Sequence, residues 1–187
     1  MQTIETSIPG ILRVVPKRHS DPRGYFSEVF RDDLFRAGVA DLAFIQDNMS
    51  LSREVGTIRG LHFQSEPKPQ GKLVRCLAGA ILDVAVDIRV GSPTFGRHVA
   101  VELTPENGEW LWIPVGFAHG FCTLVPDTVV LYKVTDYYSA AADKGVAFDD
   151  PDIGIAWPVE PAAAVLSDKD RRQPRLADLP TYFTHSA

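Results

Sequence analysis

The sequence predicts an all-β fold, with residues 1 to 187 forming one antiparallel sandwich or barrel domain. Between residues 44 and 138, short apolar and alternating runs follow one another, separated by clusters of Gly, Pro, Asn or Asp. No long helical pattern interrupts these runs, as it would in a parallel sheet with crossover helices. With 187 residues, 45% of them hydrophobic, the chain is long enough to bury a sizeable core.

The first 31 residues alternate apolar and polar side chains around turn signals at IPG (8 to 10) and SDPRG (20 to 24), which predicts two or three short strands. The next segment, DDLFRAGVADL (32 to 42), begins with acids and repeats apolar residues at helical spacing. It is the best helix candidate in the first half of the chain, and Gly38 is expected to make it short and weak.

Strand alternation sorts the side chains of the central region into faces. In ILDVAVDIR, residues 81 to 89, the apolar even-numbered positions share one face, and Asp83 and Asp87 share the other. In VVLYKVTDYY, residues 129 to 138, the same rule places Tyr132 and Asp136 on one stripe. A tyrosine and a carboxylate on one stripe can line a cavity or face water.

The C-terminal region is irregular. AADKGVAFDDPDIGIAWP, residues 141 to 158, has Gly and Pro at short intervals, which predicts an ordered loop that crosses the surface. In LSDKDRRQPRLADLP, residues 166 to 180, Ser167 stands three residues before Asp170. This spacing predicts one or two helical turns with a capping-type start.

Charge and hydropathy limit the partners. A net charge of -5 and a pI near 5.5 give no general attraction for nucleic acid or for an anionic membrane, so a phosphate-bearing ligand needs a local basic cluster. No apolar run reaches the roughly 18 residues of a spanning helix, and no leader is evident, so we expect a cytoplasmic protein. Cys76 and Cys122 lack zinc-ligand spacing and are expected to be small buried residues, although a disulfide stays open.

Two histidine-bearing segments raise the question of a metal. Pro114, Gly116 and His119 match the PxGxxH motif of cupin jelly-roll barrels (double-stranded β-helices), whose turn positions one inward histidine. The other cupin motif needs HxH, whereas here the sequence reads His62, Phe63, Gln64. One histidine per motif falls short of the three or four ligands of a firm centre. We therefore expect no metal or other cofactor, with a metal-dependent cupin as the alternative.

His62 lies in RGLHFQ, residues 59 to 64, and is expected to project from a strand as a general base. Removal of a proton beside a carbonyl gives an enolate, whose charge a cation such as Lys72 can stabilise. Tyr132 can serve as an acid. The structural alternatives are a buried core histidine at position 62 and a cross-strand packing aromatic at position 132.

Seven segments in order carry a family resemblance: RGLHFQ, QGKLVR, DVAVDIR, SPTFG, LWIPVGFAHGF, LYKVTDYYS and LSDKD. Together they resemble the dTDP-4-dehydrorhamnose 3,5-epimerases, cupin-fold enzymes of dTDP-rhamnose biosynthesis. The resemblance implies a homodimeric isomerase that inverts C3 and C5 of dTDP-4-dehydro-6-deoxy-D-glucose, giving dTDP-4-dehydro-L-rhamnose. The alternatives are an epimerase or ketoisomerase that acts at one centre, and a sugar-nucleotide-binding cupin without catalysis.

The resemblance also implies residue roles. It makes His62 the base, Tyr132 the acid on the opposite face of the sugar, Lys72 the enolate stabiliser and Asp170 the partner of the base. The stretch before LSDKD is one residue longer than in some relatives, so Asp168 is the alternative partner. Asp170 also has a rival role in a capping box with Ser167.

Substrate contacts implied by the resemblance fall on Arg23, Glu28, Gln46, Asp47, Asn48, Arg59, His119, Tyr138, Asp143 and Lys169. The basic members suit a diphosphate, because guanidinium groups pair with phosphate oxygens. Position 143 is often Glu in relatives. His119 can alternatively play a structural role under the site. Arg59 has the opposite strand parity from His62, so both face one pocket only if Gly60 permits a bulge or twist; otherwise Arg59 reaches the ligand from the rim.

Overall fold

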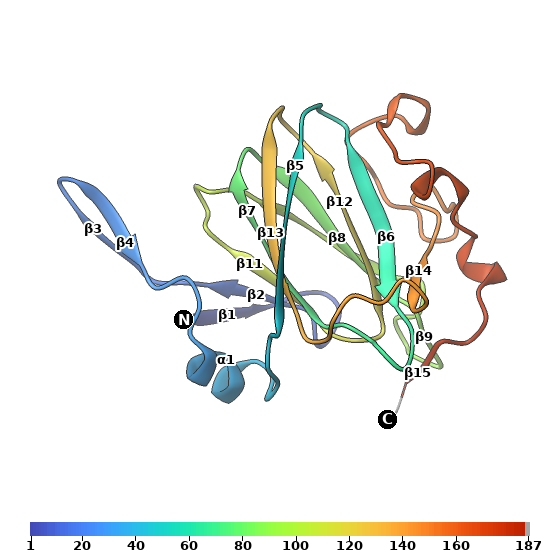
Figure 1. The fold of residues 1–187 in the computed structure, drawn as a ribbon, viewed down its shortest axis with the longest axis horizontal. Helices are drawn as coiled ribbons and strands as arrows, with labels where there is room; N and C mark the ends of the chain where they lie inside the picture. Colours follow the sequence, from blue (N-terminus) through green and yellow to red (C-terminus); the bar gives the residue numbers. More distant parts are fainter. Residues whose placement is uncertain (186–187) are drawn as a thin grey trace.

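The computed structural model describes residues 1 to 185, and two antiparallel sheets dominate it (Figure 1). The six-stranded sheet has the order β1 (Gln2–Glu5), β2 (Leu12–Val15), β11 (Trp110–Ile113), β7 (Lys72–Ala78), β13 (Thr128–Val134) and β5 (Gln46–Ser52). The five-stranded sheet has the order β10 (His98–Leu103), β8 (Ile81–Asp87), β12 (Phe117–Thr123), β6 (Ile58–Gln64) and β14 (Asp143–Gly145). The predicted all-β jelly-roll fold is confirmed.

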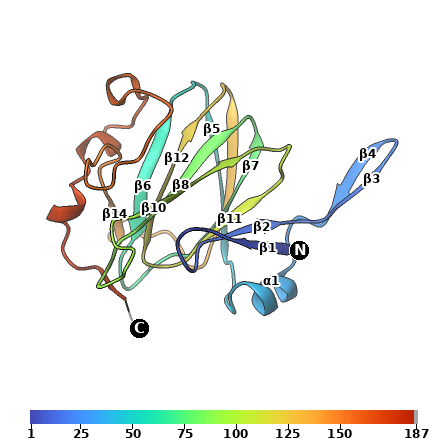
Figure 2. The ribbon, with the colours of Figure 1, turned by 180° about the vertical axis from the view of Figure 1, so that it is seen from behind.

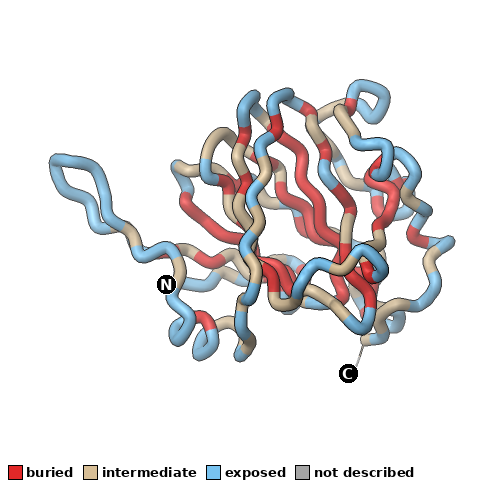
Figure 3. The backbone as a smooth tube through the Cα atoms, viewed as in Figure 1, coloured by how far each residue is buried: buried red, intermediate tan, exposed pale blue. Residues whose placement is uncertain are grey.

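The main core lies between the two sheets, where the barrel strands are buried along most of their length (Figure 3). Ile81 and Ala85 of β8 face this core, whereas Val84 and Val86 belong to a second cluster on the outer face of the same sheet. The alternation predicted for this strand is therefore confirmed, and it directs Asp83 into the barrel.

The first 31 residues form more strands than predicted, four instead of two or three. Beyond β1 and β2, the strands β3 (Arg18–Asp21) and β4 (Gly24–Ser27) pair as a hairpin that projects away from the barrel (Figures 1 and 2). The predicted helix is α1 (Asp32–Gly38). It begins where expected and ends at the glycine. Phe35 anchors it by edge-on contacts with Phe44 and Trp112.

The C-terminal segment covers the outer face of the five-stranded sheet. It contains β14, three 3-10 helices and a short strand, namely η1 (Pro161–Ala163), η2 (Asp170–Arg172), η3 (Leu176–Asp178) and β15 (Phe183–Thr184), the last paired in parallel with β9 (Arg89–Val90). Leu176 and Ile153 bury the outer apolar side chains of β6 and β8. This packing places η2 against β6. Both η2 and η3 lie within residues 166 to 180, where one or two helical turns were predicted.

Both cysteines are buried and free, as expected of small core residues, so the open question of a disulfide between Cys76 and Cys122 is answered in the negative. None of the helices within residues 1 to 185 has the length and apolar character needed to cross a bilayer.

Candidate active site

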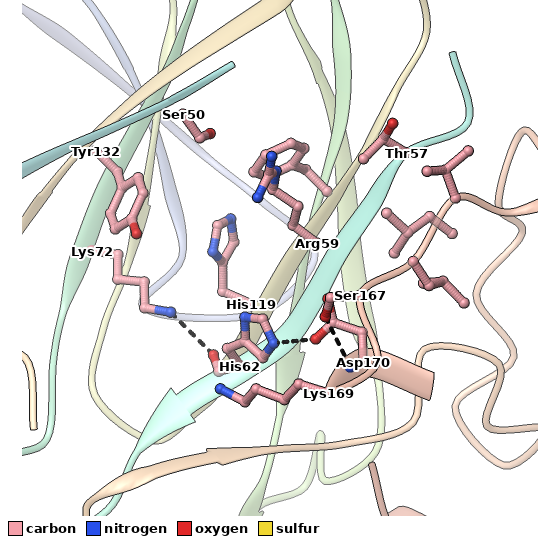
Figure 4. Close-up of a pocket in the computed structure, with 14 residues that line it drawn as sticks. Ser50, Thr57, Arg59, His62, Lys72, His119, Tyr132, Ser167, Lys169 and Asp170 are labelled. Atoms are coloured by element: carbon pink, nitrogen blue, oxygen red, sulfur yellow. Dashed lines mark hydrogen bonds and ion pairs between the residues drawn. The ribbon is translucent and has the colours of Figure 1, made fainter. Parts of the chain in front are cut away.

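A cavity of about 470 Å³ opens between the two sheets beneath the C-terminal segment (Figure 4). A second hollow of about 170 Å³ adjoins it. Both are lined by His62, Lys72, Tyr132 and Lys169, so they form two lobes of one pocket. His62, Lys72 and Tyr132, which the sequence suggested for proton transfer, therefore lie together where the two lobes join.

A bulge in β6 brings Arg59 and His62 into this pocket. His62 pairs with His119 of β12, but Arg59 pairs with Phe121, so β6 has one residue more than its partner between these positions. The extra residue sits beside Gly60, which has a φ of +135° and whose added Cβ would lie 2.6 Å from Cα of Gly120. Of the two alternatives that the sequence left open for Arg59, the structure shows the bulge at Gly60, and Arg59 lines the cavity despite its opposite parity.

The imidazole of His62 is held by a buried carboxylate. Nε2 of His62 lies 2.5 Å from Oδ1 of Asp170, and the side chain of Asp168 is exposed instead. Burial alone would raise the pKa of Asp170, but the hydrogen bond from His62 holds that pKa below its ordinary value. The N–H of Asp170 donates to Oγ of Ser167 at 3.1 Å, so the turn is capped while its carboxylate orients His62.

Lys72 is buried beside this pair. Its ammonium donates to the carbonyl oxygen of His62 at 3.1 Å. Burial lowers the pKa of Lys72 to about 8, although Asp143 and Asp83 oppose the shift. The result is a nearly desolvated cation that projects from β7 into the cavity.

His119 forms a second pair of the same kind. Its Nε2 lies 2.8 Å from Oδ1 of Asp83, and both side chains are buried. Burial lowers the pKa of His119, while Asp83 opposes the shift. Oδ2 of Asp83 has no hydrogen-bond partner among the described residues.

Tyr132 reaches the cavity from the opposite sheet. It stands on β13, whereas His62 stands on β6, and the tyrosine hydroxyl points toward the space between Lys72 and His119 (Figure 4). Burial raises its pKa, and Arg59 opposes the shift, so the phenol keeps its proton at neutral pH. A base on one wall and a neutral acid on the other can deprotonate and reprotonate a carbon from opposite faces.

The smaller lobe gathers predicted substrate contacts that end in polar groups: Gln46, Asn48, Tyr138, Asp143 and Lys169. The hydroxyl of Tyr138 lies 3.2 Å from Oδ2 of Asp143, and Lys169 forms an ion pair with the same oxygen. Lys169 and Arg59 place two cationic side chains around the pocket, which suits an anionic ligand.

Three predicted contacts lie outside this pocket in the single chain. Asp47 points to the other face of β5, where both its oxygens lie 2.9 Å from Nζ of Lys133. Arg23 is exposed near the tip of the projecting hairpin, paired with Asp21. Glu28, just beyond β4, lies within 4.0 Å of Arg31.

Sequence reasoning missed several lining residues, among them Ser50, Thr57, Phe121, Ser167, Gln64 and Gln70. Ser50 could have been found, because strand alternation puts it on the same face as Gln46 and Asn48. Val165 and Leu166 come from the irregular C-terminal segment, where no periodicity indicates which residues face inward.

No group of three His, Cys, Asp or Glu side chains within residues 1 to 185 is arranged to hold a metal ion. At the place where cupins carry a second metal ligand, the amide of Gln64 is engaged by main-chain groups, with Oε1 accepting from the N–H of Ser139 at 2.7 Å.

Comparison with known proteins finds relatives that match nearly the whole chain. A family model described as dTDP-4-dehydrorhamnose 3,5-epimerase matches residues 5–178. A dTDP-4-dehydrorhamnose 3,5-epimerase from Sinorhizobium fredii is 58% identical over 96% of this chain and 91% of its own length. A dTDP-6-deoxy-D-glucose-3,5-epimerase from Legionella pneumophila, solved in complex with dTDP-4-keto-L-rhamnose, superposes with a TM-score of 0.93, 40% identity and coverage of 100% of this chain and 99% of that one.

A second kind of relative shares the fold. A 3'-monoepimerase from Streptomyces bikiniensis, solved in complex with dTDP-quinovose, is 38% identical and superposes with a TM-score of 0.85. The match covers 92% of this chain and 86% of that one. The fold is therefore shared by enzymes described as acting at two centres and by one described as acting at one.

Proposed function

The chain belongs to the dTDP-4-dehydrorhamnose 3,5-epimerase family, and from this premise we propose that it inverts C3 and C5 of dTDP-4-dehydro-6-deoxy-D-glucose to give dTDP-4-dehydro-L-rhamnose. One observation carries the proposal. His62 of β6, held by Asp170 of η2, faces the half-buried phenol of Tyr132 on the other sheet, with the ammonium of Lys72 beside them.

The reaction uses these groups in turn. With Nε2 held by Asp170, Nδ1 of His62 takes the proton from the carbon beside the ketone, and the C–H electrons form the enolate with its charge on the C4 oxygen. The ammonium of Lys72 stabilises that oxyanion. Tyr132 then donates its proton to the opposite face of the same carbon, which inverts the centre. Reprotonation of Tyr132 and deprotonation of His62 by solvent restore the site for the second carbon.

The nucleotide is held around the same pocket. Arg59 is oriented by Oγ of Ser52 at 3.0 Å and the carbonyl of Leu51 at 3.1 Å, so its guanidinium is preorganised for phosphate oxygens. Lys169 adds a second cation from the C-terminal turn. These two groups hold the diphosphate of an anionic substrate in a chain whose net charge is -5.

The working unit in this proposal is a homodimer. The hairpin of β3 and β4 leaves Tyr25 and Phe26 exposed by 57% and 71%, and β5 is an open edge of its sheet. A second copy that covers these surfaces brings Arg23 and Glu28 to the neighbouring pocket.

Phe26→Glu is expected to halve the mass measured by light scattering and to weaken dTDP binding. An unsubstituted chain that is monomeric and fully active contradicts the dimer.

Product analysis in D₂O tests the reaction itself. Incubation with dTDP-4-dehydro-6-deoxy-D-glucose is expected to give deuterium and inverted configuration at both C3 and C5, read by NMR. Lasting inversion at only one carbon contradicts the proposal in favour of a single-centre epimerase. Binding without any deuterium incorporation contradicts catalysis altogether.

A further inference from the structure

Residues 136 to 139 leave the end of β13 and run along the smaller lobe, carrying Tyr138 to the pocket. These four residues belong to none of the described strands. Their main-chain groups therefore lack a sheet ladder and need other partners.

Glutamine side chains supply those partners. Nε2 of Gln70 donates to the carbonyl of residue 136 at 2.7 Å. Gln64 donates to the carbonyl of residue 137 at 3.2 Å and accepts from the N–H of residue 139 at 2.7 Å. Oε1 of Gln46 accepts from the N–H of Tyr138 at 3.1 Å. Three amides thus hold four successive residues.

Gln64 is the centre of this arrangement. Its residue is only 4% exposed, and Nε2 donates a further bond of 2.6 Å to the carbonyl of Lys68. A primary amide carries donors and an acceptor in one plane, so it can engage a carbonyl and an N–H two residues apart much as a neighbouring strand does. Leucine or methionine at this position would remove the hydrogen-bond partner of each of those main-chain groups.

The side chain that this segment presents is Tyr138, whose residue is 60% exposed. An aromatic ring that is mostly exposed has little packing to hold it, so its location depends on its main chain and on the contact of its hydroxyl with Asp143. The ring lines the pocket beside Asp143, where its face is available to a planar group of a ligand.

We propose that Gln64 and Gln70 are positioning residues which, together with Gln46, hold the main chain of residues 136 to 139 and so fix the place of Tyr138 against the nucleotide-linked substrate. This inference rests on the proposed function, because it presumes a nucleotide-linked substrate. It assigns the two glutamines no contact with the reacting carbons, so they act on binding and not on proton transfer.

Gln64→Met tests the inference, because methionine keeps the length of the side chain and removes the amide. The Kd of dTDP, from calorimetry, and the KM of the sugar nucleotide are each expected to rise about 10-fold, the scale of a misplaced stacking contact, with kcat within about 2-fold. Gln70→Met removes one hydrogen bond to residues 136 to 139, whereas Gln64→Met removes two. It should therefore raise the Kd of dTDP and the KM of the sugar nucleotide by only about 3-fold. Ser65→Ala, which removes a neighbouring buried hydroxyl bonded to residue 142, should leave both unchanged.

A Tyr138→Ala background separates positioning from a general structural effect. If Gln64 acts through the ring, Gln64→Met changes the Kd of dTDP by less than about 2-fold in that background. A full 10-fold loss there, or a fall in kcat at unchanged KM, overturns the inference. So does an unchanged Kd in Gln64→Met when the unsubstituted chain binds dTDP and turns over its substrate. Failure of the unsubstituted chain to bind dTDP overturns the proposed function as well.

Discussion

His62 and His119 lie directly opposite each other on β6 and β12, and each imidazole is bonded through Nε2 to its own carboxylate. The two pairs differ in exposure. The side chain of His62 is 30% exposed to the pocket, whereas that of His119 is 8% exposed and its partner Asp83 is completely buried. Burial lowers the pKa of His119, which disfavours its protonation. The accessible member of the two is therefore the one placed to take a proton from substrate.

Replacement of His62 by asparagine should remove the base while keeping a polar side chain of similar size. We expect kcat to fall by about 10³-fold, within the usual range for a positioned base, and deuterium incorporation from D₂O at C3 and C5 to fall with it. The Kd of dTDP should stay within about 2-fold. His98→Asn, on β10 outside the pocket, is the matched control and should keep full activity. Undiminished deuterium incorporation by His62→Asn contradicts the assignment of the base.

The carboxylate partner is tested by two neighbouring aspartates. Asp170→Asn removes the charge that favours the imidazolium, so we expect kcat to fall by about 10²-fold in steady-state assays. Asp168→Asn changes an exposed carboxylate two residues away and should alter kcat by less than about 2-fold. The reverse ranking of the two variants rules out Asp170 as the partner.

Periodicity predicted the parts of the site that strands supply. Alternation in β8 separated Asp83 from its apolar neighbours. The opposite parity of Arg59 and His62 pointed to Gly60 as the place where a bulge could bring both into one pocket, and the register of β6 and β12 shows that bulge. Alternation in β5 likewise places Ser50 on the face that carries Gln46 and Asn48. These successes have one physical cause, namely that a strand fixes the direction of each side chain.

The other contacts of the site depend on long-range packing, which strand alternation does not predict. Asp170 reaches His62 because η2 docks on β6, and nothing in the spacing of LSDKD indicates that contact. The glutamine bonds to residues 136 to 139 join three separate segments, so their meeting depends on the assembled barrel. Arg23 and Glu28 came from the family resemblance, and within one chain they lie outside the pocket.

The bulge in β6 should not accommodate a side chain at position 60. In Gly60→Ala, the new Cβ meets Cα of Gly120 at 2.6 Å and the carbonyl oxygen of His119 at 2.8 Å, at a φ that L residues rarely adopt. We expect the free energy of unfolding, from urea denaturation, to fall by about 3 kcal/mol and kcat/KM to fall with the displacement of Arg59. Gly38→Ala, at the end of α1 with open space around it, should change stability by less than about 1 kcal/mol. Equal stability of the two variants contradicts the close approach of β6 and β12.

The pKa of Lys72, lowered to about 8 by burial, predicts how activity depends on pH. The ammonium form stabilises the oxyanion, so kcat/KM of the unsubstituted chain should fall as pH rises through about 8. Lys72→Met should lower kcat by about 10²- to 10³-fold, because the enolate charge loses its nearest cation. An activity profile that stays flat up to pH 10 contradicts this role.

The contribution of Lys72 to stability should change with pH in the opposite direction from activity: activity falls as pH rises through about 8, whereas this contribution becomes less unfavourable. Below pH 8 the lysine is protonated in both the folded and the unfolded chain, so the whole cost of burying its charge is present. From pH 8 to the ordinary value of 10.5, only the unfolded chain keeps the proton, and the contribution of Lys72 to the free energy of unfolding becomes steadily less unfavourable. Lys72→Met should therefore be more stable than the unsubstituted chain by about 2 to 3 kcal/mol at pH 7. Urea denaturation of both chains at several pH values measures the difference, which should shrink as pH rises through that window. A difference in stability that is constant with pH, or a methionine variant that is less stable than the unsubstituted chain, would contradict the presence of a desolvated charge on Lys72 in the folded chain.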